Sequence, residues 1–525
     1  MVSLDVLRIS SGKMQSDEGK REDIVMDGGQ VSLLVGNGLD IQIGGDDFQN
    51  KWIIVRLLAK AKVGKYDILF SDKKTGTPII AGDKIVELFR DLVPYANRAI
   101  NNEFDAIVEE YGDKDLADAL KDFKDSHPVE VKSIEEIGME DWFLIFLLYL
   151  LQEQDLLDQY EFIKQGFERM ILDSIYCEGY IQKLYLKLNK ASSNYLSEYD
   201  KIFTLNYDNT IEALIKKNVY HLHGDFNTIH PSESIENALG YIRISKNENV
   251  YFPDEYRHCN CTGILDFSGN RKYKYATDMT KAFIAFEKLK KDIKIDKIKM
   301  EDILTKVPDA QLELVKVGIE KDLNVGHNYF FDELETLSGT LEIVGLAPQN
   351  DSHIFECINK SSVDTVVFYH YFGNKTAAEV EAEIETMFIP INKDYTIKNV
   401  KNIWDKTKII KPANASNDIS QKQLELLNAL SFTSEVTRDD IIWQLNSIPK
   451  FTRNAIIEMM KHEIEKSKYH QTPENEQKFA QNFKDFSSTL EIAALSPQAL
   501  LYLYIDSTKP TTKKKMNNKK RRKRR

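Results

Sequence analysis

The first apolar run of the chain reads VSLLVGNGLD (residues 31–40) and ends in a glycine-rich turn. Its uninterrupted apolar half is typical of a strand that is buried on both faces of a parallel sheet. Glycines directly after such a strand let the backbone approach a ligand phosphate, and the N–H groups of the next helix can bind it. The run therefore predicts an α/β fold with a ligand site at this turn, although the turn also fits a purely structural connection. The candidate binding residues are Gly36, Asn37, Gly38 and Asp40.

Further strands are predicted downstream. Their sequences are KIFTLN (201–206), VYHLHG (219–224), TLEIVGL (340–346) and DTVVFYHY (364–371). The segments YDNTIEALIKK and DSHIFECINK, which lie between successive strands, read as helices. A strand, a helix and a strand in this order imply a right-handed crossover between parallel strands. The pattern predicts a Rossmann-like, doubly wound parallel sheet within residues 29–395.

The remaining parts of the chain differ in composition. Residues 50–195 carry apolar side chains at helical spacing and predict a large helical insertion between the first and second strands. Residues 1–28 are polar, and residues 396–420 have the composition of a linker. Residues 421–508 predict a C-terminal helical domain, and residues 509–525 predict a disordered basic tail.

The overall composition narrows the class of protein. With 42% apolar and 29% charged residues in 525, a wholly disordered or collagen-like chain is excluded. The net charge of −12 hides a division, because the tail carries eleven basic residues and leaves about −23 for residues 1–508. Four cysteines are too few for a disulfide scaffold and fit a reducing compartment. The longest apolar run, Trp142–Leu151, is shorter than the about 20 residues of a membrane helix, so we expect a cytoplasmic protein with no membrane partner.

The glycine turn does not match the fingerprint of hydride-transfer enzymes. That fingerprint needs a third glycine, where this chain has Ile41, and an acidic residue about 20 positions further on, near Arg56. A nicotinamide-dependent oxidoreductase is therefore disfavoured.

Polar residues follow the second predicted strand in the segment TLNYD (Thr204–Asp208). Ligands of open α/β sheets bind beyond the carboxyl ends of the strands, where Asn206 and Asp208 would lie. Both residues also have the side chains that cap helices, and a helix is predicted to start near Asn209. The segment alone leaves both interpretations open.

Two histidines occupy the third predicted strand in the segment HLHGD (221–225). Because His221 and His223 alternate along a strand, they should point to opposite faces. His223 stands at the strand end beside Gly224, where a histidine could exchange a proton with a ligand. A hydrogen-bonded core histidine is the alternative interpretation.

In combination these motifs resemble those of the sirtuins (the SIR2 family). Sirtuins carry a glycine turn after the first strand, then a TQNxD segment, then an LHG histidine. Here Asn206 and Asp208 precede His223 by 17 and 15 residues, which is the sirtuin spacing. A late segment, GLAPQND (Gly345–Asp351), resembles the glycine loop that closes on the nucleotide.

The chain also departs from the sirtuin deacylases. Those enzymes hold a structural zinc with two CxxC pairs, whereas this chain has a single CxC pair, Cys259 and Cys261, next to His258. Its turn reads GNGxD rather than GAGxS and is followed by Asp47-Phe48. Both features are closer to the AbiH-like abortive-infection proteins of bacteria, which look like divergent relatives of the SIR2-like NADases of antiphage defence.

The resemblance implies an NAD⁺ hydrolase that releases nicotinamide and ADP-ribose without a metal. Asp208 would bind the nicotinamide carboxamide, Asn206 would orient the ribose and an attacking water, and His223 would be the general base. Thr204, the first glycine turn, Gly345 and Asp351 would bind the rest of NAD. As a defence protein it would act as a homo-oligomer or with a defence-system partner.

Three other functions stay open. An NAD-dependent protein deacylase would use the same residues, and a nucleotide sensor would use the same fold without catalysis. A nucleic-acid-associated protein is the third, supported by the tail Lys509–Arg525 and by a helix pair at about 439–463. The helix pair also fits an ordinary αα-hairpin.

Overall fold

A computed structural model describes most of the chain between the predicted polar N-terminal segment and the predicted basic tail, which both lie outside the described residues. The described ranges are 29–72, 75–152, 160–228, 241–242, 254–265, 268–295, 299–305, 309–346, 351–387, 391–414, 416–428, 436–466 and 495–508. None of the helices in these ranges is long and apolar enough to cross a membrane.

The described chain contains a six-stranded, all-parallel sheet. Its strand order is β3-β2-β1-β6-β7-β8. The chain starts at the centre, moves outward to one edge, and then returns to the other side of β1, which is the doubly wound order of Rossmann-like folds. The predicted α/β class and parallel sheet are confirmed. The strands are β1 (Val31–Val35), β2 (Lys201–Thr204), β3 (Tyr220–His221), β6 (Ser338–Val344), β7 (Ser362–His370) and β8 (Asp394–Asn399).

The central strand β1 is buried on both faces, as its continuous apolar sequence predicted. Leu34 packs into the core formed with Phe355 and the other apolar residues of α14 (Ser352–Lys360). Leu33 and Val35 face the opposite core, which is shared with α1 (Gly38–Gly44). The period of two along a strand therefore anchors the turn after β1 from both sides.

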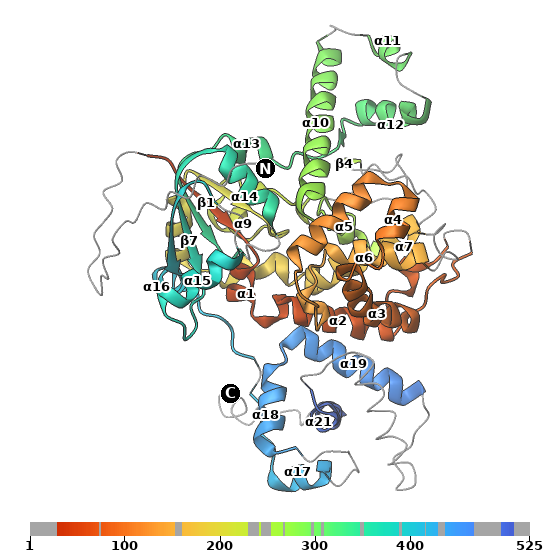
Figure 1. The fold of residues 1–525 in the computed structure, drawn as a ribbon, viewed down its shortest axis with the longest axis vertical. Helices are drawn as coiled ribbons and strands as arrows, with labels where there is room; N and C mark the ends of the chain where they lie inside the picture. Colours follow the sequence, from red (N-terminus) through yellow and green to blue (C-terminus); the bar gives the residue numbers. More distant parts are fainter. Residues whose placement is uncertain are drawn as a thin grey trace, which may run out of the picture.

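The described elements between β1 and β2 are α-helices and short 3₁₀ segments, in agreement with the predicted insertion. Figure 1 shows the longer of them, in orange, beside the sheet. The apolar run Trp142–Leu151 forms most of a helix packed inside this unit. The α-helices after α1 are α2 (Asn50–Lys62), α3 (Gly82–Ile100), α4 (Asp105–Tyr111), α5 (Lys114–Ser126), α6 (Asp141–Gln152), α7 (Tyr160–Tyr176) and α8 (Lys190–Ser197).

A second group of helices follows β2. It begins with the short helix α9, which was predicted, and continues with the long helix α10 at the top of Figure 1. Two short strands, β4 (Tyr241–Ile242) and β5 (Asn324–Val325), form a separate parallel pair. The helices of this part are α9 (Thr210–Ile215), α10 (Gly269–Lys294), α11 (Met300–Leu304), α12 (Asp309–Glu320) and α13 (Phe331–Glu335). Helix α15 (Ala377–Met387) lies between β7 and β8.

The prediction that residues 396–420 form a linker is wrong for the first part of this segment. Residues 394–399 form β8, the edge strand of the sheet, and α16 (Lys401–Thr407) follows at once. The sequence DYTIKN has no continuous apolar run, because β8 pairs with β7 on one side only and much of it is exposed. The sheet domain therefore continues beyond residue 395.

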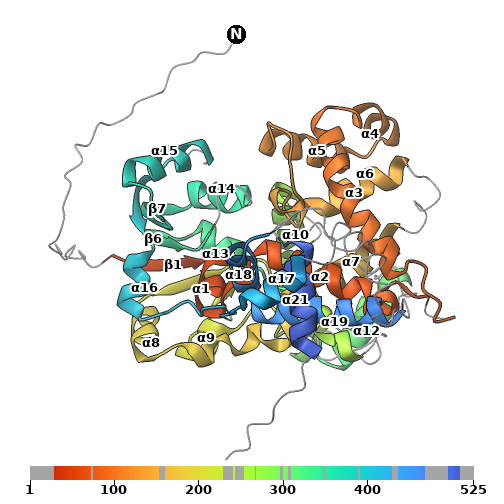
Figure 2. The same cartoon turned by 90° about the horizontal axis from the view of Figure 1, so that it is seen from below.

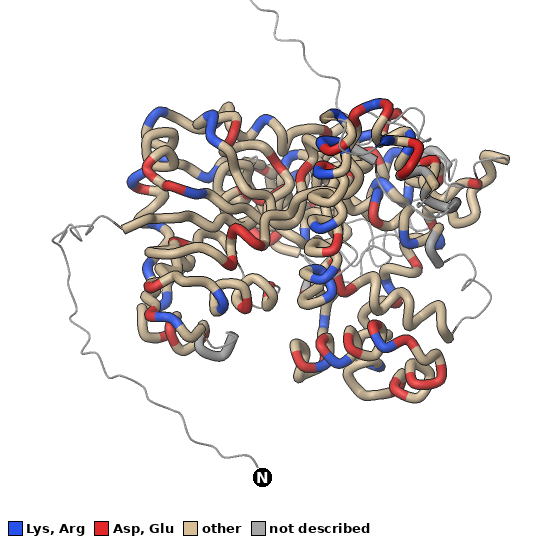
Figure 3. Tube along the Cα trace, turned by 90° about the horizontal axis from the view of Figure 1, so that it is seen from above, with Lys and Arg blue, Asp and Glu red and all other residues tan. Residues whose placement is uncertain are grey.

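The C-terminal helices pack against the insertion. They are α17 (Gln421–Asn428), α18 (Arg438–Ser447), α19 (Lys450–Lys466) and α21 (Pro497–Thr508). Helix α19 lies along α2. The other C-terminal helices, also blue, lie near α19 in Figures 1 and 2. Figure 3 shows that Lys and Arg alternate with Asp and Glu along the described chain in that view, so the acidic excess is not gathered on that face.

Candidate functional site

Two glycine turns meet where the order of the strands reverses. The N–H of Gly36 donates to the carbonyl of Val344 (2.9 Å), and the N–H of Gly38 donates to the carbonyl of Gly345 (2.8 Å). A Cβ atom on Gly36 would lie 2.6 Å from the Gly345 oxygen. The glycines are therefore required for the close contact between the turns. Because both N–H groups are already bonded to protein, they are not the phosphate donors that the sequence suggested.

A cavity of about 1320 Å³ opens at this edge of the sheet. A crevice at the carboxyl ends of the strands, at the reversal point, is where open α/β sheets bind ligands. Most of the predicted residues line it: Gly36, Asn37, Gly38, Asp40, Asn206, His223, Gly345 and Asp351. Thr204 and Asp208 do not line it, and lie instead at a much smaller pocket of about 10 Å³ behind Asn206.

Asn206 is held firmly at the wall of the cavity. Its side-chain amide donates to the carbonyl of Gly36 (3.3 Å), and its backbone N–H donates to the hydroxyl of Thr204 (3.0 Å). Its carbonyl lies 3.1 Å from Nδ1 of His221. Thr204 thus supports Asn206 and does not reach the cavity itself.

Asp40 and Asp208 form a buried carboxyl pair. Burial, then the charge and hydrogen bond of Asp208, raise the pKa of Asp40 well above its usual value. Asp208 accepts a hydrogen bond from the N–H of Thr210 (2.7 Å), the first residue of α9, so its side chain serves the start of that helix although Asn209 is the N-cap residue. Asp40 lines the large cavity, and its Oδ1 atom has no hydrogen-bond partner among the described residues. Of the two carboxyl groups, Asp40 is the one that a ligand would meet.

The two histidines after β2 have separate environments, as their alternation predicted. Burial lowers the pKa of His221, but its hydrogen bond to Glu212 and the nearby carboxylates outweigh this effect and raise the pKa to about 9. His221 therefore forms a buried ion pair with Glu212 and is absent from the cavity wall. His223 lines the cavity and bonds to His353.

His223 contacts a second histidine that the sequence analysis missed. Its Nε2 atom lies 3.0 Å from Nε2 of His353, in the first turn of α14, and 3.9 Å from Oδ1 of Asp351. Burial first, and then the charge of Lys272, lower the pKa of both histidines well below the usual value. Both rings are therefore neutral at physiological pH. The sequence DSH places His353 two residues after a predicted site residue, which was its only signal.

A buried ion pair stands behind these histidines. Lys272 of α10 is 1% exposed, and its Nζ lies 2.8 Å from Oε1 of Glu140. Glu140, just before α6, also lines the cavity. Burial, with an added contribution from Glu140 and an opposing one from Lys272, raises the pKa of Asp351 to about 7. Neither Lys272 nor Glu140 belongs to a recognisable motif, so the sequence did not indicate them.

Three lysines line the cavity as well. They are Lys51, Lys401 and Lys411, and His370, Trp404 and Asp405 line it with them. Lys411 forms an ion pair with Asp46, whereas Lys401 belongs to the first turn of α16. Ammonium groups in the wall of a polar cavity suit a ligand with phosphate groups.

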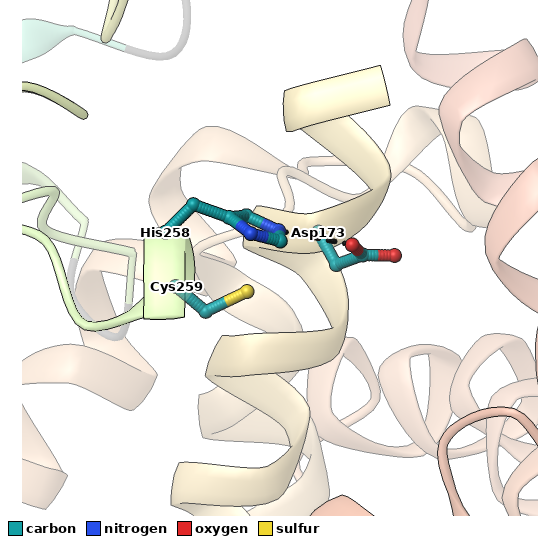
Figure 4. Close-up of side chains that lie close together, drawn as sticks. All are labelled: Asp173, His258 and Cys259. Atoms are coloured by element: carbon teal, nitrogen blue, oxygen red, sulfur yellow. Dashed lines mark hydrogen bonds and ion pairs between the residues drawn. The ribbon is translucent and has the colours of Figure 1, made fainter. Parts of the chain in front are cut away.

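One further cluster of metal-ligand types lies away from the cavity. Figure 4 shows Asp173 of α7 facing His258 and Cys259. The two Asp173 oxygens already bind Nε2 of His258 (3.0 Å), Nζ of Lys60 (2.9 Å) and the hydroxyl of Tyr66 (2.8 Å). These contacts outweigh burial and lower the pKa of Asp173. With the carboxylate matched by protein groups, the cluster is explained as an ion-pair network that fastens residues 254–259 to α7.

Within the part of the chain that the structure describes, His223, Asp351 and His353 are the other group of residues near enough to one another to hold a metal ion. The ammonium of Lys272 acts on all three groups and disfavours a second cation there. The distance of 3.0 Å between the two histidines is that of a direct hydrogen bond. The expectation of a metal-free site stays a prediction.

The helix pair that suggested nucleic-acid binding is α18 and α19. In a DNA-binding pair, the N-terminal residues of the second helix face the bases. Here the N-terminal N–H groups of α19, those of Phe451 and Thr452, donate to Asp47 at 3.1 and 3.0 Å. This end of α19 is packed inside the protein, so the αα-hairpin interpretation fits better.

Neither the scan against models of protein families nor the search of curated proteins gives a match for this chain.

Proposed function

We propose that this protein is an NAD⁺ hydrolase of the SIR2-like, AbiH-like type that acts in antiphage defence. The observation that carries the proposal is the convergence of Asn206, His223 and Asp40 on one cavity at the reversal point of a doubly wound sheet. Ligand cavities commonly measure about 300–1,000 Å³, so one of about 1320 Å³ has room for a dinucleotide.

The proposed ligand lies across the cavity from the histidines to the lysines. The nicotinamide end occupies the polar wall at Asn206 and Asp40, and the pyrophosphate is directed toward Lys51 and Lys401. Asp40 takes the contact with the carboxamide that the resemblance assigned to Asp208, because Asp208 lies behind it and serves the start of α9. Asp40 lines the large cavity whereas Asp208 does not, which supports this exchange of roles.

The proposed reaction breaks the bond between nicotinamide and the ribose. As the bond lengthens, positive charge develops on the ribose, and a water molecule oriented by Asn206 adds to the anomeric carbon. The proton of that water passes to His223, which is neutral and therefore able to accept it. Nicotinamide leaves with the bonding electron pair, and the other product is ADP-ribose. A positioned base of this kind contributes typically 10²–10⁴-fold to the rate.

The test is incubation of the purified full-length protein with NAD⁺, followed by chromatography for nicotinamide and ADP-ribose. We expect N206A and H223A to lose turnover by at least about 10²-fold while the folded state is retained. The matched control is H462A, because His462 is exposed on α19, far from the cavity residues in sequence. EDTA should leave turnover unchanged.

Two results would contradict the proposal. If NAD⁺ is consumed neither by the purified protein nor in phage-infected cells that express it, the enzymatic function is wrong. If N206A and H223A turn over like the wild type, the assigned site is wrong. Binding of NAD⁺ without cleavage, measured by calorimetry, would favour a nucleotide sensor, and turnover that requires an acetylated peptide would favour a deacylase.

A further inference from the structure

The contact between His223 and His353 has the geometry of a hydrogen bond between two imidazoles. Their Nε2 atoms are 3.0 Å apart, and the ring planes differ by only 21°. The ring centroids are 5.2 Å apart, much further than the two nitrogens, so the rings meet edge to edge. His353 is fully buried and His223 is 4% exposed. Such a bond between neutral rings requires that one Nε2 atom carries a proton and that the other does not.

This requirement determines which nitrogen of His223 can act on a ligand. Nδ1 of His223 has no hydrogen-bond partner among the described residues, and the side chain lines the cavity. If His223 donates its Nε2 proton to His353, Nδ1 keeps its lone pair and can accept a proton from the cavity. In the reverse arrangement Nδ1 carries the proton and cannot serve as a base.

The tautomer of each histidine in the pair depends on that of the other, because the described residues around the pair do not fix either one. Nδ1 of His353 has no partner among the described residues, so no neighbour there fixes the tautomer of that ring. The charged groups that face the pair are Lys272 from α10, Asp351 before α14, and Glu140 before α6, which binds Lys272. The ammonium of Lys272 disfavours a positive charge on either ring, which keeps an imidazole–imidazole bond in place of an ion pair.

We propose that His353 is a positioning residue. It accepts a hydrogen bond from the Nε2–H group of His223, and this leaves Nδ1 of His223 unprotonated and facing the cavity as the basic atom. The proposal rests on the proposed function, because it concerns the base of that reaction. When Nδ1 takes a proton from water, His223 becomes an imidazolium. Its Nε2–H bond to the neutral His353 is then charge-assisted, which stabilises the protonated base.

The first experiment measures the tautomer directly and needs no turnover. The full-length protein is labelled with ¹⁵N-histidine, and long-range ¹H–¹⁵N correlations are recorded for the wild type, H223Q, H353Q and H353L. We expect His223 to be protonated at Nε2 and to lose this preference in H353L, which has a side chain of similar size with no acceptor. A wild-type His223 protonated at Nδ1, or one whose tautomer is unchanged in H353L, would overturn the proposal.

The second experiment separates positioning from structural support. H353L should lower kcat for NAD⁺ by about 10²-fold with KM changed less than about threefold, and H353Q, whose amide oxygen can accept the Nε2 proton, should recover most of the loss. Equal loss in both variants would show that His353 only fills space. If NAD⁺ is not cleaved by the wild type but the NMR result holds, the proposed function fails and the pairing stands. Stoichiometric metal bound by the two histidines would overturn the pairing.

Discussion

The carboxylate of Asp47 accepts a hydrogen bond of 3.0 Å from the hydroxyl of Thr452, although 405 residues separate them in the chain. The same carboxylate binds Arg56, which is 1% exposed and also donates to the carbonyl of Ser174. This network joins α2, α7 and the start of α19. Phe48, the next residue, accepts a hydrogen bond from Asn37 of the glycine turn, so the network reaches the cavity wall through one further contact.

Loss of the Asp47 carboxylate should therefore loosen the C-terminal helices. D47A leaves Arg56 buried without its charge partner, and we expect a loss of about 3 kcal/mol in the free energy of unfolding. Thermal unfolding and limited proteolysis of the C-terminal helices measure the effect. The exposed pair of Lys84 and Glu87 supplies the control, because E87Q should change stability by less than about 0.5 kcal/mol. Equal effects of the two substitutions would show that the network does not hold the helices.

A side chain at Gly38 should separate the two turns. Its Cβ atom would lie 2.6 Å from Cα of Gly345, which belongs to the backbone and cannot rotate away. We expect G38A to cost about 1–3 kcal/mol and to lower NAD⁺ turnover, because Gly36 and Asn206 shift with the turn. G112A is the comparison, since Gly112 lies in an open environment. Its left-handed φ (+73°), which Gly38 does not share, should make this substitution cost about 1 kcal/mol with full turnover. Full turnover in G38A would contradict the close contact.

The Asp40–Asp208 pair should make stability dependent on pH. The pKa of Asp40 is raised in the folded state by burial and by Asp208. Its protonated form therefore contributes stability that is complete below about pH 4, the pKa of an unfolded aspartate, and is lost as pH rises through the raised pKa. D40N stays neutral, so its Tm should fall less than that of the wild type between pH 5 and pH 8. D115N, at an exposed residue, is the control, and its Tm should change with pH as that of the wild type does. If the Tm profiles of D40N and the wild type are parallel, Asp40 does not hold a proton in this pH range.

Asp351 should control the affinity for anionic nucleotides near neutral pH. Because its pKa is raised to about 7, the carboxyl is mostly neutral at pH 6 and mostly ionised at pH 8. The added negative charge at the cavity should weaken ADP-ribose binding by about fivefold, or ~1 kcal/mol. Calorimetry at both pH values should show this change in the wild type and not in D351N. If D351N keeps the change, the titrating group is another residue of the cavity.

The sheet was predictable to the extent that its strands are buried. Four of the five strands predicted from apolar segments, β1, β2, β6 and β7, have a neighbour on both sides, and most of their buried side chains are apolar. The fifth, β3, is an edge strand with one buried and one half-buried residue. Strand β8 was missed because the edge position lets DYTIKN remain polar. Strand β3 is shorter than predicted, since the chain turns at Leu222 toward the cavity.

The site was predictable where it depends on strand ends. Asn206 and His223 follow neighbouring strands, and the carboxyl ends of parallel strands share one edge, so their convergence follows from topology. The sequence could not predict that Asp40, and not Asp208, would line the cavity, because this depends on how α1 and α9 pack. Lys272, in α10, and Glu140, just before α6, lie in segments whose sequences carry no chemical motif, and only the tertiary fold brings them to the histidines.

The central position of β1 has a consequence for the order in which the molecule can be built. During synthesis β1 emerges first, yet Ser32 pairs with Lys201, and Val31 pairs with Thr340 on the other side. At about 5–20 residues per second, the strand waits on the order of 10–30 s for its first neighbour and longer for the second. The helices encoded between β1 and β2 are available during that interval. The helical insertion is thus placed to fold first on the ribosome and to shelter an apolar strand that would otherwise expose two unpaired edges.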